Sequence, residues 1–172
     1  MDTALKAYAA TGARGSIEHA QVTTSQGMEE MSRLGLTASV QPAHLLDDHE
    51  TTDRVWADRT DRCFTLRSLL DHGVAVALGS DAPVAPLDPW LAIATAAHRG
   101  LPGDEPWHPE QAITAAEAIA ASADGTRIAV GQPGDLALLD FDPLASDAAG
   151  LRAMRVALTC VAGQVVHSEF AI

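Results

Sequence analysis

Apolar positions along the first two-thirds of the chain follow two alternating spacings. Short runs of apolar, small or β-branched residues predict strands at 16–20, 36–40 and 74–78. Apolar residues at helical spacing, or stretches opened by proline, predict helices at residues 4–9, 28–34, 64–70, 89–98 and 109–121. Strands that alternate with helices favour an α/β architecture with parallel strands.

Two segments of this part have a distinctive composition. Residues 74–78 are wholly apolar, which is typical of a strand buried on both faces of a parallel sheet. Residues 43–62 are polar and rich in aspartate, and we expect an excursion with one short helix around Trp56. The acidic pair Asp47 and Asp48 is interpreted as a solvated loop, with a lid over a site as the alternative.

The last third of the chain changes character. A Pro-Gly turn precedes an expected strand at 134–140, and the runs 156–161 and 164–166 flank Gly163 as in a β-hairpin. We therefore expect an α/β part at residues 1–125 and a small β part at residues 126–172.

Composition and charge exclude several classes of function. Of 172 residues, 47% are hydrophobic, which is enough for a packed core, and the net charge is −12. A nucleic acid or an anionic membrane surface would require a basic face, so neither is expected as a partner. The sequence also contains no apolar span and no secretory signal, which makes the cytoplasm the expected location.

Three polar residues stand at or just beyond the carboxyl ends of three successive predicted strands: His19, His44 and Asp81. In parallel α/β folds, reactive groups gather at that edge of the sheet. Imidazoles and a carboxylate suit zinc and similar divalent ions, and an aspartate beside such an ion can also act as a general base.

Each of the three residues also has a purely structural interpretation. His19 alone would most often be a hydrogen-bonded loop residue. His44 follows a proline closely and could cap the polar excursion, and Asp81 after Gly-Ser could be an N-cap or an Asx-turn residue. Spacing alone therefore supports a metal site only weakly.

Several ordered motifs give a more specific indication. They are IEHAQ at 17–21, ASVQPAH at 38–44, LGSDAPV at 78–84, LDPWL at 87–91, VGQPGDLALLD at 130–140 and VAGQVV at 161–166. Together they resemble the amidohydrolase superfamily, in particular the branch that includes the N-substituted formamide deformylases. The resemblance covers nearly the whole chain.

The resemblance implies a fold and a chemistry. The fold would be the C-terminal portion of a TIM-like (β/α)8 barrel, strands six to eight, followed by strands of a small composite β-sandwich. The reaction would be metal-dependent hydrolysis of a non-peptide carbon–nitrogen bond in a small amide-type substrate. His19 would bind the metal, expected to be zinc; Asp81 would bind it and transfer the proton; His44 would line the substrate pocket.

One departure from the superfamily pattern is large. The sequence contains no His-x-His, so the metal pair of a first barrel strand is missing, and only three of eight barrel strands are recognisable. We therefore expect a C-terminal fragment, with exposed sheet edges that favour a homo-oligomer. The alternative hypothesis is a non-catalytic remnant that self-associates and binds no metal.

Overall fold

Three short parallel strands form the sheet of the first part of the chain. In the computed structural model, which describes residues 1–123 and 128–170, these are β1 (Ser16–Glu18), β2 (Thr37–Val40) and β3 (Ala75–Leu78). They lie in the order β1-β2-β3, so β2 is central and pairs with both neighbours. The predicted α/β architecture with parallel strands is confirmed.

The two faces of this sheet have different environments. Ala38 of β2 is fully buried, and its neighbours Ile17 and Val76 pack against the same core. Alternate positions point to the opposite face, where Glu18 is exposed and Ser39 is half-buried. The expectation that residues 74–78 are buried on both faces is wrong for β3, because β3 is an edge strand whose four residues all remain partly or fully exposed.

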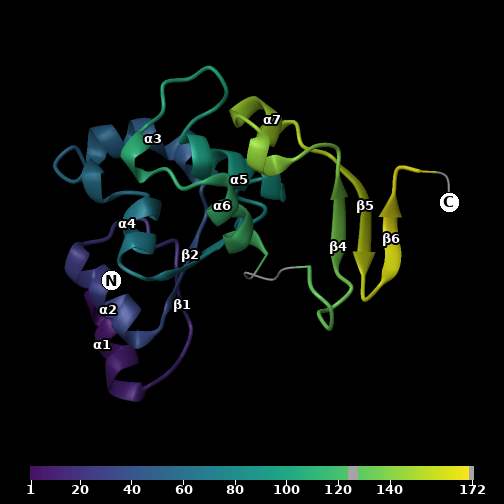
Figure 1. Ribbon diagram of the computed structural model, residues 1–172. Coiled ribbons are helices and arrows are strands. Elements are labelled where there is room, and N and C mark those ends of the chain that lie inside the picture. The colour runs from purple at the N-terminus through teal and green to yellow at the C-terminus, as the bar shows by residue number, and fades with distance from the viewer. Residues whose placement is uncertain (124–127, 171–172) are drawn as a thin grey trace.

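Helices cover the apolar face of the sheet (Figure 1). The helices of the chain are α1 (Asp2–Thr11), α2 (Ser25–Leu34), α3 (His44–Val55), α4 (Leu66–Asp71), α5 (Pro89–His98), α6 (Ala115–Ser122) and α7 (Ala148–Arg152), with short 3-10 turns η1 (Thr60–Arg62), η2 (Pro109–Gln111) and η3 (Pro143–Ala145). Buried side chains of every α-helix except α3 form one main core with the sheet, whereas Leu45 of α3 packs in a separate cluster with Cys63 and Phe64. Within the described residues, no helix is long and apolar enough to cross a membrane.

Local signals explain why the predicted helices α2 and α5 begin and end where they do. Gly35 ends α2 in the left-handed conformation, at φ 63°, which glycine adopts without steric cost. The Asp88 carboxylate accepts hydrogen bonds from the backbone amides of Trp90 and Leu91, at 3.0 and 3.1 Å, and so caps α5. Pro89 occupies the first turn of that helix, where its missing N–H costs nothing.

Two predicted segments differ from the structure. Residues 43–62 contain the twelve-residue helix α3, which ends before Trp56, instead of a mostly irregular excursion with one short helix. The predicted helix 109–121 is divided into η2 and α6, because Ala112 is extended, with ψ 145°. Thr114 then starts α6 with a capping box that it forms with Glu117.

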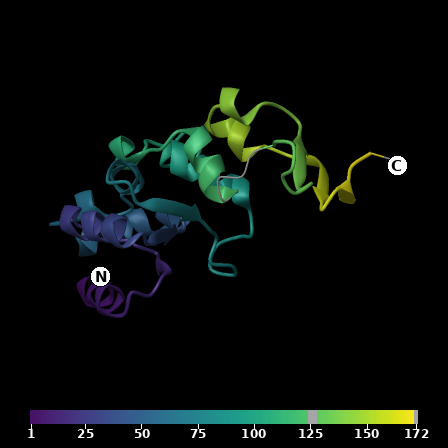
Figure 2. The same ribbon diagram turned by 60° about the horizontal axis from the view of Figure 1, so that its bottom comes forward.

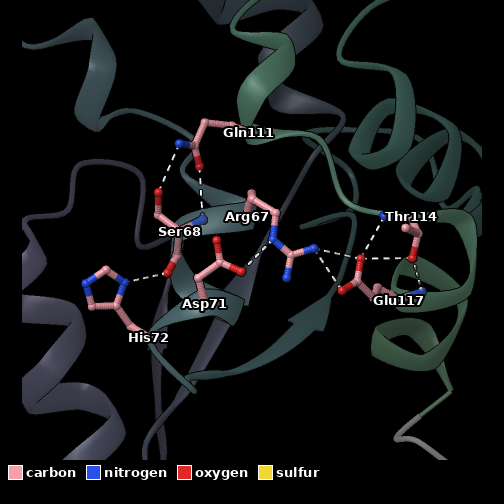
Figure 3. A network of polar contacts seen from close by, with 7 residues as sticks. All are labelled: Arg67, Ser68, Asp71, His72, Gln111, Thr114 and Glu117. Atoms are coloured by element: carbon pink, nitrogen blue, oxygen red, sulfur yellow. Dashed lines mark hydrogen bonds and ion pairs between the residues drawn. The ribbon is translucent and has the colours of Figure 1, made fainter.

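A network of polar contacts joins α4 to η2 and α6 (Figure 3). Nη1 of Arg67 donates to both carboxylate oxygens of Glu117, at 2.8 and 2.9 Å, while its Nε donates to Asp71 at 2.9 Å. The Gln111 side chain accepts from the backbone amide of Ser68 and donates to its hydroxyl. These contacts hold α6 beside the edge strand β3.

The last part of the chain is an antiparallel sheet of β4 (Leu136–Leu139), β5 (Val156–Val161) and β6 (Gln164–Ser168). The predicted hairpin is confirmed. Figures 1 and 2 show this sheet to one side of the helices of the α/β part, with α7 next to those helices. Leu151 of α7 is fully buried in the main core, and Arg152 forms an ion pair with Asp88 at 2.8 Å. Helix α7 therefore attaches the antiparallel sheet to the α/β part.

Candidate metal centre

The three candidate residues meet beyond the carboxyl ends of the parallel strands. His19 directly follows β1, His44 is the first residue of the helix that follows β2, and Asp81 lies in the loop after β3. One possible ligand atom from each residue lies within 4.8 Å of the other two. The convergence expected from three separate strand ends is therefore present.

The backbone at two of these residues is strained. His19 and Asp81 have φ angles of 64° and 55°, and Ala20 after His19 has φ 41°. Residues other than glycine disfavour this left-handed backbone conformation. The non-glycine residues that do adopt it gather at functional sites. Ala20 is buried, and its amide donates to the carbonyl of Glu18 at 2.8 Å. His19 is therefore held in a tight turn directly after β1.

The two histidine rings lie against each other. Their centroids are 6.0 Å apart and their planes differ by 26°. Nε2 of His44 is buried and has no hydrogen-bond partner among the described residues. A buried nitrogen without a partner is costly unless a ligand satisfies it. Two imidazoles and the exposed Asp81 carboxylate form a donor set that fits zinc or a similar divalent ion.

Two polar residues near the centre were not identified as site residues from the sequence. The Glu18 carboxyl, next to His19, has a lowered pKa because the Ser16 and Ser39 side chains hydrogen-bond to it. Asp48 accepts a hydrogen bond from the Gln21 side chain at 3.2 Å. The sequence places Asp48 in a loop or lid, whereas the structure places it on α3. The alternation of apolar and polar positions along β1 is the sequence pattern that could have pointed to Glu18.

A hollow of about 340 Å³ lies beside the loop that carries Asp81. Its walls include Gly79 and Ser80 just before Asp81, Leu87 and Asp88 ahead of α5, and Ser122 at the end of α6. The three candidate residues are not among its walls, and His19 and Asp81 are exposed. The candidate centre is thus open at the surface of the chain.

Comparison with known proteins matches the model of the amidohydrolase family to residues 1–167. The chain belongs to the amidohydrolase family. The putative amidohydrolase YtcJ of Bacillus subtilis (strain 168) is 28% identical over 173 residues, which cover 92% of this chain and 33% of that protein. The N-substituted formamide deformylase of Arthrobacter pascens is 29% identical over 183 residues, covering 95% of this chain and 34% of the deformylase.

The family likeness extends to solved structures. An uncharacterized metal-dependent hydrolase from Pyrococcus horikoshii OT3 matches with a TM-score of 0.70 and 28% identity, over 86% of this chain and 33% of that one. The chain thus spans about a third of the length of these relatives. The resemblance to the amidohydrolase superfamily inferred from the motifs is confirmed, and hydrolysis is the reaction class of the family.

Proposed function

We propose that this chain carries part of the catalytic centre of a metal-dependent hydrolase that cleaves non-peptide carbon–nitrogen bonds in small amide-type molecules. The convergence of His19, His44 and Asp81 within 4.8 Å carries the proposal. The similar Pyrococcus hydrolase is metal-dependent, and the similar Arthrobacter enzyme is a deformylase of substituted formamides. Since the chain spans about a third of such proteins, the activity is proposed for the whole protein.

His19 and Asp81 are the proposed ligands of a divalent ion, with zinc favoured by the imidazole and carboxylate donors. When bound, such an ion supplies the Lewis acidity that allows water to act as a nucleophile near neutral pH. Asp81 is exposed and therefore accessible to solvent and substrate. Its carboxylate accepts the proton of the attacking water and delivers it to the leaving amine.

His44 is the proposed substrate contact. Its buried Nε2 has no hydrogen-bond partner among the described residues, so a polar group of the substrate can satisfy it. The ring of His44 packs beside that of His19, which places the substrate contact next to the proposed ion. Such a contact orients the scissile group toward the water and contributes through positioning.

We further propose that β1, β2 and β3 are the sixth to eighth strands of a TIM-like barrel. Their parallel order and the site at their carboxyl ends support this assignment. Residues 1–125 then form the barrel part, and residues 126–172 contribute to a small β-sandwich. Catalytic zinc sites use three or more protein ligands, so this arrangement leaves further ligands to other barrel strands.

A metal titration of the purified 172-residue chain tests the proposal. We expect zinc or cobalt(II) to bind, measured by competition with a chromophoric chelator, and His19→Ala and Asp81→Ala to weaken binding at least about tenfold. His49→Ala is the matched control, because the Nδ1 atom of His49 contacts the Leu45 carbonyl within α3. Absence of metal binding by the wild-type chain would instead support a non-catalytic remnant.

A further inference from the structure

One side-chain hydrogen bond connects the two segments that carry the candidate histidines. Nε2 of Gln21 donates to Oδ2 of Asp48 at 3.2 Å, across 27 positions in the sequence. Gln21 lies two residues after His19. Asp48 lies four residues after His44, so the two side chains share one face of α3. Each partner of this bond is therefore adjacent to one histidine.

Both ends of the bond are anchored to well-packed backbone. The carbonyl of Gln21 accepts from the amide of Phe64 at 3.0 Å, and the next residue, Val22, pairs with Cys63 in an isolated β-bridge. On α3, Leu45 is 1% exposed and packs with Cys63 and Phe64. Gln21 and Asp48 are themselves half-buried, so their hydrogen bond is partly protected from competing water.

The segment next to this bond needs restraint. His19 and Ala20 both have left-handed φ angles, and such conformations persist only where the surroundings impose them. The stacked arrangement of the His19 and His44 rings also requires a fixed distance between the β1 loop and α3. Asp48 belongs to no group of three ligand atoms found among the described residues, which argues against a role as a metal ligand.

We propose that the Gln21–Asp48 hydrogen bond is a positioning device that holds His19 and His44 together for metal and substrate. Asp48 is then a positioning residue that acts through Gln21. The consequence for the metal rests on the proposed function, whereas the arrangement of the two histidines does not. Groups that hydrogen-bond to metal ligands and orient them change metal affinity by about 10- to 100-fold in known metal sites, which sets the upper scale for a bond between the neighbouring residues.

The first arm of the test uses the metal-free chain. We expect nuclear Overhauser contacts between the ring protons of His19 and His44 in the wild-type chain, and their loss in Asp48→Ala. Asp48→Asn should retain them, because its amide oxygen still accepts from Gln21. Asp47→Ala is the matched control, since Asp47 is an exposed neighbour on the same helix. Missing contacts in the wild-type chain, or contacts unchanged in Asp48→Ala, overturn the proposal.

The second arm measures cobalt(II) affinity and the visible absorption spectrum of the bound ion. Asp48→Ala should weaken binding about 10- to 100-fold and alter the spectrum, while Asp48→Asn and Asp47→Ala stay close to wild type. Gln21→Ala should reproduce Asp48→Ala, and the double variant should add little, as expected for one shared contact.

The two arms separate the possible failures. If the wild-type chain binds no cobalt but the ring contacts follow the expected pattern, the proposed function fails and the positioning role stands. If Asp48→Ala and Asp47→Ala behave alike in both arms, the positioning role is wrong and the metal site is unaffected. Gln21→Ala keeps the comparison decisive if Asp48→Ala does not fold.

Discussion

At the scale of single residues, the strained turn at His19 lowers the stability of the fold while it places a candidate metal ligand. A φ of 64° costs a non-glycine residue about 1 kcal/mol relative to an unstrained conformation. Asp81 has the same kind of strain, at φ 55°. Two of the three candidate residues therefore occupy positions where glycine would be more stable but would supply no ligand atom.

This strain predicts that glycine is more stable than alanine at position 19, which is the opposite of the usual order in a helix. We expect His19→Gly to be more stable than His19→Ala by about 1 kcal/mol, because only glycine adopts the left-handed conformation without a steric penalty. Urea denaturation measures the difference. The matched control is Ala9→Gly at an exposed position of α1, where glycine should lower the free energy of unfolding by about 1 kcal/mol relative to alanine. A His19→Gly chain less stable than His19→Ala would contradict the assignment of strain.

Residue-level sequence reasoning predicted that His19, His44 and Asp81 lie at one edge of the sheet, because strand ends can be located from short apolar runs, and the family resemblance supplied their proposed roles. It did not identify the Gln21–Asp48 bond, because that contact depends on α3 being a helix that brings Asp48 back over the β1 loop. Backbone angles such as that of His19 are also imposed by tertiary contacts and leave no pattern in the sequence.

At the scale of elements, the contacts of Arg67 with Glu117 link α4 and α6 (Figure 3). The pKa of the Glu117 carboxyl is lowered, first by the hydrogen bond from Arg67 and then by the backbone amide of Thr114. A carboxyl with a lowered pKa in the folded state stabilises the fold above its unfolded pKa. That contribution is lost as the pH falls through the folded pKa.

We therefore expect Glu117→Gln to lower the free energy of unfolding at neutral pH by about 1 kcal/mol, the usual scale of a capping residue and a partly exposed ion pair. The difference from wild type should shrink as the pH falls through the lowered pKa of Glu117. Urea denaturation across this range measures it, with the exposed Glu29→Gln on α2 as the control. A difference independent of pH would argue against the charged contact.

The elements that sequence reasoning predicted well have strong local signals. Asp88 and Pro89 start α5, and Gly35 ends α2. Helix α3 was underestimated because its buried positions include a threonine, Thr52, which is 3% exposed, and the helix carries many charges. The break at Ala112 was missed because Thr114 and Glu117, which restart the helix, also fit a continuous helix.

At the scale of the whole molecule, apolar side chains remain uncovered on the antiparallel sheet. Leu138 is 51% exposed and Val166 is 61% exposed. Within residues 1–123 and 128–170, the outer edges of β1 and β3 also pair with no further strand. Exposed strand edges and apolar sheet surface favour association with another chain.

We expect that the 172-residue chain, purified by itself, associates with a second copy that covers the antiparallel sheet. Sedimentation velocity at micromolar concentrations should show dimers or larger species. Val166→Lys should shift the distribution toward monomer, because a charge at that position is costly to bury. Val130→Lys is the control, since Val130 is fully exposed outside the strands. A monomeric wild-type chain would contradict the proposal.

The position of β2 between β1 and β3 sets the width of the candidate centre. Neighbouring strands are about 4.8 Å apart, so the strands that precede His19 and Asp81 are separated by roughly twice that spacing. Ligand atoms of these residues nevertheless approach within 4.8 Å, which means that both side chains converge over the end of β2. The pairing of β1 and β3 with β2 therefore fixes the distance between the strand ends that carry His19 and Asp81. Substitutions at the candidate residues can then change the donor atoms without changing the spacing of the strands that carry them.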